Sequence, residues 1–168
     1  MAHKIDVIPN SECKPRCPST YDKFKHQISE KIITELDTGK IVHSKSSNSI
    51  GMIILTKRLK PREVRFLLDC LARNVVTHTD MTPMPSMHQI LDFLASRPFK
   101  SKLDLTDGHH NIRIHSDSVG DSTFTYQIGK FDSLVMQQGD CNAPATIMRA
   151  MNYQFREVKD PMIYLDHI

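Results

Sequence analysis

The chain has 168 residues, of which 39% are hydrophobic and 24% charged, and its formal net charge is +3. This composition is typical of a globular protein of about one domain and excludes a mainly disordered chain. No apolar run approaches the roughly 20 residues of a membrane span, and the first residues lack the apolar stretch of a signal peptide. The sequence therefore predicts a cytoplasmic or nuclear protein, neither secreted nor bound to a membrane.

The charge is unevenly distributed along the chain. Residues 1–84 hold 14 basic and 9 acidic side chains, whereas residues 85–168 hold 8 and 10. A basic first half suits a polyanionic partner and an acidic second half suits bound cations, although chance variation on a solvated surface explains the same numbers. The spacing of the cysteines matches neither a zinc knuckle nor a secreted disulfide framework, which favours free thiols at Cys13, Cys17, Cys70 and Cys141.

The first predicted elements are an arm and a helix. Residues 7–18 contain three prolines and no periodicity, which indicates an extended arm. Apolar residues at three- and four-residue steps predict a helix over residues 19–38, capped by Ser19 and ended by Gly39. The serine-rich stretch at 43–49 is predicted to be a loop.

A hairpin and a short helix come next. Apolar strands at 52–55 and 64–68 flank the basic turn at 57–62, which predicts a β-hairpin with a positively charged tip. A proline-containing connection at 77–85 leads to Ser86, a suitable helix cap. The helix after it is expected to turn four apolar residues inward: Met87, Ile90, Leu91 and Leu94.

The second half mixes strands and helices. Strands are predicted at 99–105, 122–127 and 131–136, the last two around a turn at Gly129 and Lys130, and a final short strand at 162–165. A helix is predicted over 142–158, with Pro144 in its first turn and a buried stripe of Ile147, Met151, Phe155 and Val158. Because strands and helices do not alternate strictly, the expected fold class is α+β.

Two carboxylates stand at or near strand ends. Asp104 follows the apolar pattern of residues 101–105, and Asp166 follows that of residues 163–165. If the two strands are neighbours, both carboxylates converge and can hold two Mg²⁺ ions about 3.5–4 Å apart, as nucleotidyl transfer requires. Spacing alone favours the alternative, two unrelated strand-end aspartates that face water.

Six segments resemble, in the same order, the motifs of one family. They are GKIVHSKSS, KRLKPREVRFLLDCLARN, TDMTPMPSMHQILDFL, FKSKLDLTDGHHNIRI, VMQQGDCNAPATIMRAMN and IYLDHI. The second is similar to K-K-D-G-x-x-R-x-x-V-D-Y-R-x-L-N, the fifth to V-M-P-F-G-L-x-N-A-P-A-T-F-Q-x-x-M-N and the sixth to V-Y-L-D-D-I. These motifs belong to the reverse transcriptases of gypsy-type LTR retrotransposons, and the resemblance runs from near residue 3 to residue 168.

The resemblance implies an α+β fold of reverse-transcriptase-like fingers and a partial palm, with a mixed or antiparallel sheet and packed helices. We expect an extended arm at 1–18, a fingers-like part at 19–84 and a palm-like part at 85–168. The chain is expected to be a degenerate or truncated copy that stops after the Y-x-D-D-like strand, before the thumb.

The resemblance also implies roles for individual residues. It assigns catalysis to Asp104 and Asp166, and metal binding to Asp104, the carbonyl of Leu105, Asp166 and His167, with Mg²⁺ or Mn²⁺ as cofactor. It assigns nucleotide binding to Lys57, Arg58, Arg65, His109 and Gln138, and template binding to Asn74, Asn142 and Pro144. The implied partners are an RNA or DNA template–primer and a deoxynucleoside triphosphate.

Several positions depart from the family. His167 replaces the last aspartate of Y-x-D-D and removes a hard oxygen ligand, which Mg²⁺ prefers. His109 replaces an aromatic residue near the sugar, Leu71 an arginine at the template, Asp140 an apolar residue of the P-F-G-L turn, and Asp121 a lysine. These changes predict impaired catalysis.

Three functional hypotheses follow. The first is an impaired RNA-directed DNA polymerase domain. The second is a non-catalytic module that binds nucleic acid or protein, including self-association through an unpaired palm edge. The third is a transition-metal site near Asp104 and Asp166, built from His109, His110, His115 and His167.

Overall fold

The computed structural model of the chain describes residues 1–11, 24–57, 60–126 and 128–165. The side chains of residues 56–65 lie outside this description. Two apolar clusters organise these residues. One joins the first helix to the strands, and the other surrounds the last helix. The mixture of helices with antiparallel strands confirms the α+β class.

Helix α1, Lys25–Asp37, packs one face against the first cluster. Ile28 and Ile32 lie one turn apart and are fully enclosed, as the four-residue spacing predicts. The helix ends before Gly39, which adopts a φ of 66°. The predicted start at Ser19 lies outside the described residues.

Gly39 closes α1 in a Schellman motif, in which its N–H donates to the Leu36 carbonyl at 3.0 Å and Lys40 N–H donates to the Glu35 carbonyl at 2.9 Å. A β-carbon at 39 would meet no heavy atom within 4 Å, so only backbone conformation disfavours alanine there. We expect Gly39→Ala to lower the free energy of unfolding in urea by about 1 kcal/mol. Gly120→Ala is the matched control, because that site is equally open without a positive φ; equal losses would contradict the explanation.

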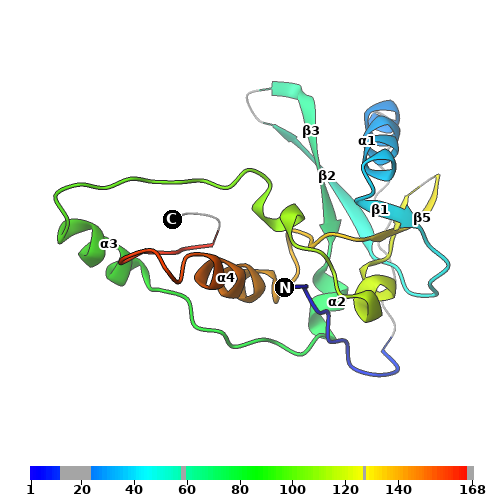
Figure 1. Cartoon of the computed structure of the whole chain (residues 1–168). Coiled ribbons are helices and arrows are strands. Elements are labelled where there is room, and N and C mark those ends of the chain that lie inside the picture. Colours follow the sequence, from blue (N-terminus) through cyan, green and yellow to red (C-terminus); the bar gives the residue numbers. More distant parts are fainter. Residues whose placement is uncertain (12–23, 58–59, 127, 166–168) are drawn as a thin grey trace.

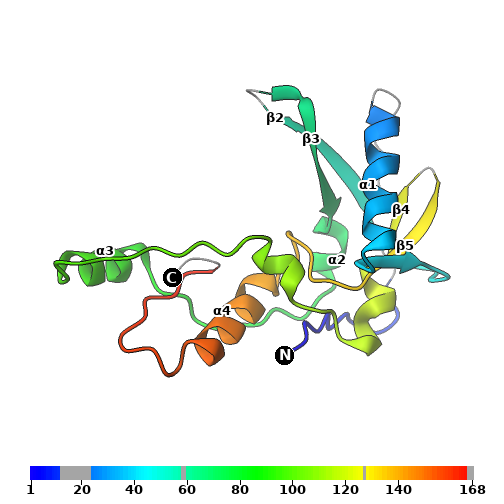
Figure 2. The same ribbon diagram turned by 45° about the horizontal axis from the view of Figure 1, so that its top comes forward.

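The predicted basic hairpin is confirmed and is longer than expected. Strand β2, Gly51–Lys57, pairs antiparallel with β3, Lys60–Asp69, in a register that runs from Gly51↔Asp69 to Lys57↔Lys60. The tip residues 58 and 59 lie outside the described part. In both views the hairpin projects from the body in the same direction as α1 (Figures 1 and 2).

The second predicted hairpin is confirmed as β4, Phe124–Tyr126, and β5, Gly129–Ser133. Gly129 and Lys130, expected in its turn, instead begin β5. Strand β1, Ile41–His43, pairs with the other edge of β5, so the sheet has the order β1-β5-β4. Sequence patterns missed β1 because three residues are too few to establish an alternation.

Phe131 holds this sheet to the first cluster. It is 1% exposed, and its ring centroid lies 5.7 Å from that of Phe124 and 5.1 Å from that of His43. The pairing of β1 with β5 joins segments on either side of residue 84, so the sheet crosses the expected boundary between the fingers-like and palm-like parts. That division of the chain stays a prediction.

The first eight residues form an extended strap that packs on the body. His3 N–H donates to the Arg113 carbonyl at 2.8 Å, and Ile8 N–H donates to the Val76 carbonyl at 2.7 Å. Ile5 between them is buried. The strap thus connects residues 113–118 with the segment after α2, Leu71–Val75, a short helix that the sequence patterns missed.

Helix α3, Met87–Ala95, begins as predicted at Ser86, in a capping box with Gln89. Ser86 Oγ accepts from Gln89 N–H at 3.3 Å, and Gln89 Oε1 accepts from Ser86 N–H at 2.7 Å. Its predicted inward face is wrong: no residue of α3 is buried, and Met87 and Leu91 are 60% and 54% exposed. Both views place α3 at the end of the molecule opposite α1 (Figures 1 and 2).

Two predicted strands are absent. Residues 99–105 have a bend at Phe99 and a single bridge position at Asp104, and residues 162–165 have a single bridge position at Tyr164. Leu165 then turns with a φ of 57°. A strand is defined by its neighbour, and no further strand of the described chain lies beside these segments.

Helix α4, Ala143–Gln154, is shorter than predicted. Pro144 lies in its first turn, and Ile147 and Met151 are buried, as expected. Phe155 follows the helix and packs partly against the second cluster, whereas Val158 is 50% exposed, so its predicted place in the stripe is wrong. Two 3₁₀ helices, η2 (Gly108–Asn111) and η3 (Ser116–Ser122), complete this region. No helix of the described chain is long and apolar enough to span a membrane.

Candidate functional site

The segment that carries Asp104 rests on the second apolar cluster. Asp104 is exposed, and the next residue, Leu105, is half-buried and packs against that cluster. The chain then turns through Asp107, whose φ of 54° is left-handed and is tolerated by aspartate. Lys40 Nζ lies 4.0 Å from Asp107 Oδ2 beside this turn.

The C-terminal segment reaches the same cluster. Ile163 is buried in the cluster, Leu165 packs against it, and Leu165 N–H donates to Met148 Sδ at 3.2 Å. Asp166 and His167 follow immediately and lie outside the described residues. The neighbours of both predicted carboxylates, Leu105 and Leu165, therefore pack on one apolar cluster, and the convergence of the carboxylates themselves stays a prediction.

The hairpin carries the predicted triphosphate-binding residues. Lys57 is the last residue of β2, and Arg65 lies in β3 opposite Leu55. The side chains of Lys57 and Arg65 are outside the description, as is the whole of Arg58. The roles of these three residues stay predictions.

Gln138 lies exposed on the turn that precedes α4. Gly139 beside it has a φ of 108°, and a β-carbon there would contact Cys70 Sγ at 3.6 Å. Asn74 holds the turn: its Nδ2 donates to the Gly139 carbonyl at 2.8 Å, and its Oδ1 accepts from Cys141 N–H at 3.1 Å. The Asn74 amide, predicted to bind template, thus has a structural role.

Asn142 has a similar structural role at the start of α4. Its Nδ2 donates to the His78 carbonyl at 2.7 Å, and its Oδ1 accepts from Asp80 N–H at 2.9 Å. Its side chain is buried by this pairing, whereas Pro144 is half-buried. Template contact by the Asn142 amide would require one of these bonds to open; the assignment stays a prediction.

The histidines do not gather into a metal site in the described part of the chain. His109 and His110 are half-buried in η2, and His115 precedes η3. Burial, and then the charge of Lys40, lower the pKa of His110. Among the described residues no three histidine, cysteine or acidic side chains are placed to hold a metal ion.

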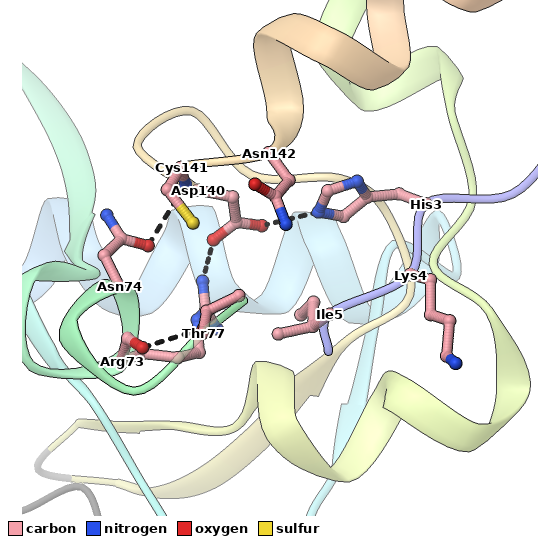
Figure 3. Close-up of a pocket in the computed structure, with 9 residues that line it drawn as sticks. All are labelled: His3, Lys4, Ile5, Arg73, Asn74, Thr77, Asp140, Cys141 and Asn142. Atoms are coloured by element: carbon pink, nitrogen blue, oxygen red, sulfur yellow. Dashed lines mark hydrogen bonds and ion pairs between the residues drawn. The ribbon is translucent and has the colours of Figure 1, made fainter. Parts of the chain in front are cut away.

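A buried polar network lies behind the Gln138 turn and was missed by sequence reasoning (Figure 3). Arg73 and Asp140 form an ion pair, with side chains 2% and 5% exposed. Arg73 also donates to the Asp121 carbonyl at 2.9 Å. His3 Nε2 lies 3.4 Å from Asp140 Oδ2, and His3 Nδ1 lies 2.9 Å from Thr146 Oγ1.

The network joins segments that are distant in sequence: the strap, α2, η3, the turn before α4, and α4 itself. Burial, and then the charges of Arg73 and Arg149, lower the pKa of His3 to about 4, so its ring is neutral at pH 7. A neutral ring with a hydrogen on Nε2 faces the Asp140 carboxylate and accepts from the Thr146 hydroxyl. The sequence held one sign of this network: Asp140 is charged, whereas the motif that it resembles has an apolar residue at that position.

No protein-family model matches the chain. It is 32% identical over 107 residues to an RNA-directed DNA polymerase homolog of Oenothera berteroana, an alignment that covers 62% of this chain and 75% of that protein. It is 29% identical over 171 residues to the retrovirus-related Pol polyprotein from transposon 297 of Drosophila melanogaster, which covers 99% of this chain and 16% of that protein. The chain thus spans about a sixth of the Drosophila transposon polyproteins that it matches.

Solved structures show the same fold. The protease-reverse transcriptase of prototype foamy virus superposes with a TM-score of 0.86 at 20% identity, over 99% of this chain and 22% of that chain. A foamy viral protease-reverse transcriptase in complex with an RNA/DNA hybrid gives a TM-score of 0.80 at 20% identity, over 98% of this chain and 22% of that chain. The fold expected from the motifs is thereby confirmed, and the chain belongs to the reverse transcriptase, or RNA-directed DNA polymerase, family represented in retrotransposon Pol polyproteins.

Proposed function

We propose that the chain binds a template–primer and a deoxynucleoside triphosphate at a two-metal nucleotidyl-transfer site, and that His167 impairs this site. Asp104, Asp166 and the carbonyl of Leu105 would hold two divalent cations, Mg²⁺ or Mn²⁺. When bound, these ions would neutralise the charge that develops during phosphoryl transfer.

One observation carries the proposal. Leu105 and Leu165 pack against the same apolar cluster beside α4, so the residues next to both carboxylates are anchored on one support. Asp104 is exposed and offers hard oxygen donors, which suit Mg²⁺. His167 offers nitrogen at the position of a third carboxylate, and nitrogen suits Mn²⁺ better than Mg²⁺.

The surroundings support a nucleic-acid partner. The hairpin that carries Lys57 and Arg65 projects from the body, and Gln138 is exposed beside the start of α4. A structural neighbour has been solved in complex with an RNA/DNA hybrid. We therefore assign nucleotide contact to the hairpin and template contact to the region around Asn142 and Pro144.

Primer extension on an RNA template tests the proposal. We expect little extension with Mg²⁺, more with Mn²⁺, and a rise of roughly tenfold or more with Mg²⁺ in His167→Asp. The reason is that loss of even an outer-shell metal partner typically costs 10–100-fold. Asp104→Asn should abolish extension under all these conditions.

Asp107→Asn is the matched control for Asp104→Asn. Asp107 is also exposed and lies three residues away. It tolerates asparagine, because aspartate and asparagine both adopt left-handed backbone. We expect it to retain the extension of the parent protein. Absence of any nucleotide addition by His167→Asp with either metal would refute polymerase activity in this chain.

The second candidate is a non-catalytic module that binds nucleic acid through phosphates. The projecting hairpin favours it, because Lys57, Lys60 and Arg65 belong to its strands. Binding of an RNA/DNA hybrid without divalent metal, with affinity that falls steeply as salt rises, would support it. Self-association through the palm edge stays a prediction, and sedimentation at low and high salt tests it.

A further inference from the structure

Two cysteines lie on segments that the buried network joins. Cys70 directly precedes α2 and is 3% exposed, whereas Cys141 lies in the turn before α4 and is half-buried. Both are free thiols in the structure. They are distant in sequence, so any contact between them depends on the fold.

The turn that carries Cys141 packs on Cys70. A β-carbon placed on Gly139 would lie 3.6 Å from Cys70 Sγ and 3.9 Å from Cys70 Cβ, so the backbone two residues before Cys141 lies against the buried thiol. Asn74 binds this turn at two points, the Gly139 carbonyl at 2.8 Å and the Cys141 N–H at 3.1 Å. Asn74 N–H in turn donates to the Cys70 carbonyl at 2.8 Å. Figure 3 shows the Cys141 side chain beside Asn74.

Electrostatic interactions also relate the two sulfurs. Burial is the main cause of the raised pKa of the Cys70 thiol, and the Arg73 guanidinium opposes it. The charges of Asp69 and of a Cys141 thiolate raise that pKa further. The Cys141 thiolate can act on Cys70 only from nearby, because the interaction of two charges weakens with distance. Arg73 Nη2, which lies 3.1 Å from Cys70 Sγ, also pairs with Asp140, the residue before Cys141.

We propose that oxidation joins Cys70 and Cys141 in an intramolecular disulfide, which links α2 to the turn before α4. The oxidant is a low-molecular-weight disulfide such as oxidised glutathione. The Cys141 thiolate attacks it, forms a mixed disulfide and releases one small thiolate. The Cys70 thiolate then attacks the Cys141 sulfur and releases the second small thiolate. The two cysteines thereby lose two electrons and two protons, and the small disulfide gains them.

The surroundings of the two thiols set the order of these steps. Cys141 is the more exposed of the two and meets the oxidant first, whereas Cys70 is enclosed and is reached from within the fold. The Arg73 guanidinium beside Cys70 Sγ stabilises the thiolate that the second step requires. Because thiolates are the nucleophiles, the link should form faster as the pH rises above 7. The proposal does not depend on nucleotidyl transfer.

Tryptic mapping after oxidation in native buffer tests the proposal on the whole chain. Trypsin cleaves after lysine and arginine and places each cysteine in a separate peptide, with Cys70 in residues 66–73 and Cys141 in residues 131–149. After treatment with oxidised glutathione we expect these two peptides to be joined in monomeric protein. Dithiothreitol should separate them again.

Oxidation of the unfolded chain is the matched comparison. In concentrated urea the shortest loop forms most readily, so the link between Cys13 and Cys17 should exceed that between Cys70 and Cys141 roughly tenfold or more. The linked native protein should also unfold at a higher urea concentration than the reduced protein, because the bond closes a long loop in the unfolded chain.

Serine variants separate the contributions of the cysteines. Cys141→Ser should remove the link and leave the enclosed Cys70 thiol unmodified, and its half-buried site makes it the safer variant for folding. Cys70→Ser should stop the reaction at a mixed disulfide on Cys141. The control is Cys13→Ser with Cys17→Ser, which changes two cysteines outside the described residues and should leave the link intact.

Three results would overturn the inference. A mixed disulfide on Cys141 that persists in the parent protein would show that the Cys70 sulfur does not reach it. Joined peptides found only in a covalent dimer would place the bond between two chains. A link between Cys70 and Cys141 that forms as readily in urea as in native buffer would show that the fold does not bring the two thiols together.

Discussion

Arg73→Leu or Asp140→Leu alone is expected to lower the free energy of unfolding by about 3–5 kcal/mol. Each variant leaves one charge in a site where both side chains are at most 5% exposed. Arg73→Leu also removes the donor to the Asp121 carbonyl. The two positions are 67 residues apart, so the pair fixes α2 against the turn before α4.

The double variant Arg73→Leu with Asp140→Leu should recover most of this loss. Replacing a whole buried ion pair by apolar side chains of similar volume is often neutral or stabilising. In the motifs V-D-Y-R-x-L-N and P-F-G-L that these segments resemble, leucine stands at both positions. The double variant therefore restores the apolar residue of the motifs at both positions.

Urea unfolding of the parent, both single variants and the double variant forms a complete cycle. Because each single variant loses about 3–5 kcal/mol and the double variant loses little, we expect a coupling energy of roughly 4 kcal/mol or more, above the usual range of about 0.5–3 kcal/mol. Arg156→Leu is a control for arginine removal at an exposed pair, where a change of about 0.5 kcal/mol or less is expected. Additive losses in the double variant would show that the two charges do not compensate each other.

Local patterns predicted the elements whose signals lie within a few residues. The spacing of Ile28 and Ile32 gave the buried face of α1, Gly39 its end and Ser86 the start of α3. Both hairpins followed from apolar runs around short polar turns. These features depend on backbone preference and periodicity, which a sequence displays directly.

Three of the failures share one location. The inward face of α3 and the strands expected at 99–105 and 162–165 all fall around one groove. The apolar spacing in these segments is typical of elements that bury one face. They require a covering element that the described chain does not supply, and no local pattern reveals whether such an element is present.

The site was predictable only in part. The spacing of apolar residues indicated a carboxylate near each of two predicted strand ends, but not that the two lie close together. Only the resemblance to the family related Asp104 to Asp166. The shared support of Leu105 and Leu165 is a tertiary contact. The pairing of Arg73 with Asp140 is also a long-range contact, and it required noticing two charged residues at apolar motif positions.

Acidification from pH 7 to pH 5 is expected to destabilise the protein through His3, by about 2 kcal/mol. Burial is the main cause of the lowered pKa of His3, about 4 against 6.5 in the unfolded chain, and the charges of Arg73 and Arg149 add to it. Asp140 lies 3.4 Å from the ring, but its charge is shared with Arg73 and does not offset these effects.

The sign follows from proton binding. Between pH 6.5 and about 4 the unfolded chain holds a proton on His3 that the folded chain does not hold, so stability falls as the pH falls. The contribution is complete above pH 6.5. Each pH unit below that value costs about 1.4 kcal/mol until the folded ring itself binds a proton.

Urea unfolding at pH 7 and pH 5 measures the effect in the parent and in His3→Gln, which keeps a polar side chain in the network. We expect His3→Gln to lose about 2 kcal/mol less than the parent over this interval. His110 also has a pKa lowered by burial and contributes to both proteins, so the difference between them isolates His3. Asp80, whose pKa is lowered by Thr82 and Arg149, acts at more acidic pH.

His26→Gln is the matched control, because His26 is 86% exposed and lies outside the network. It should show the same loss between pH 7 and pH 5 as the parent. If His3→Gln retained the full pH dependence, the neutral ring between Asp140 and Thr146 would be the wrong description of the network. A flatter profile in His3→Gln alone would show that His3, which lies 2.9 Å from Thr146 Oγ1 of α4, carries this part of the pH dependence.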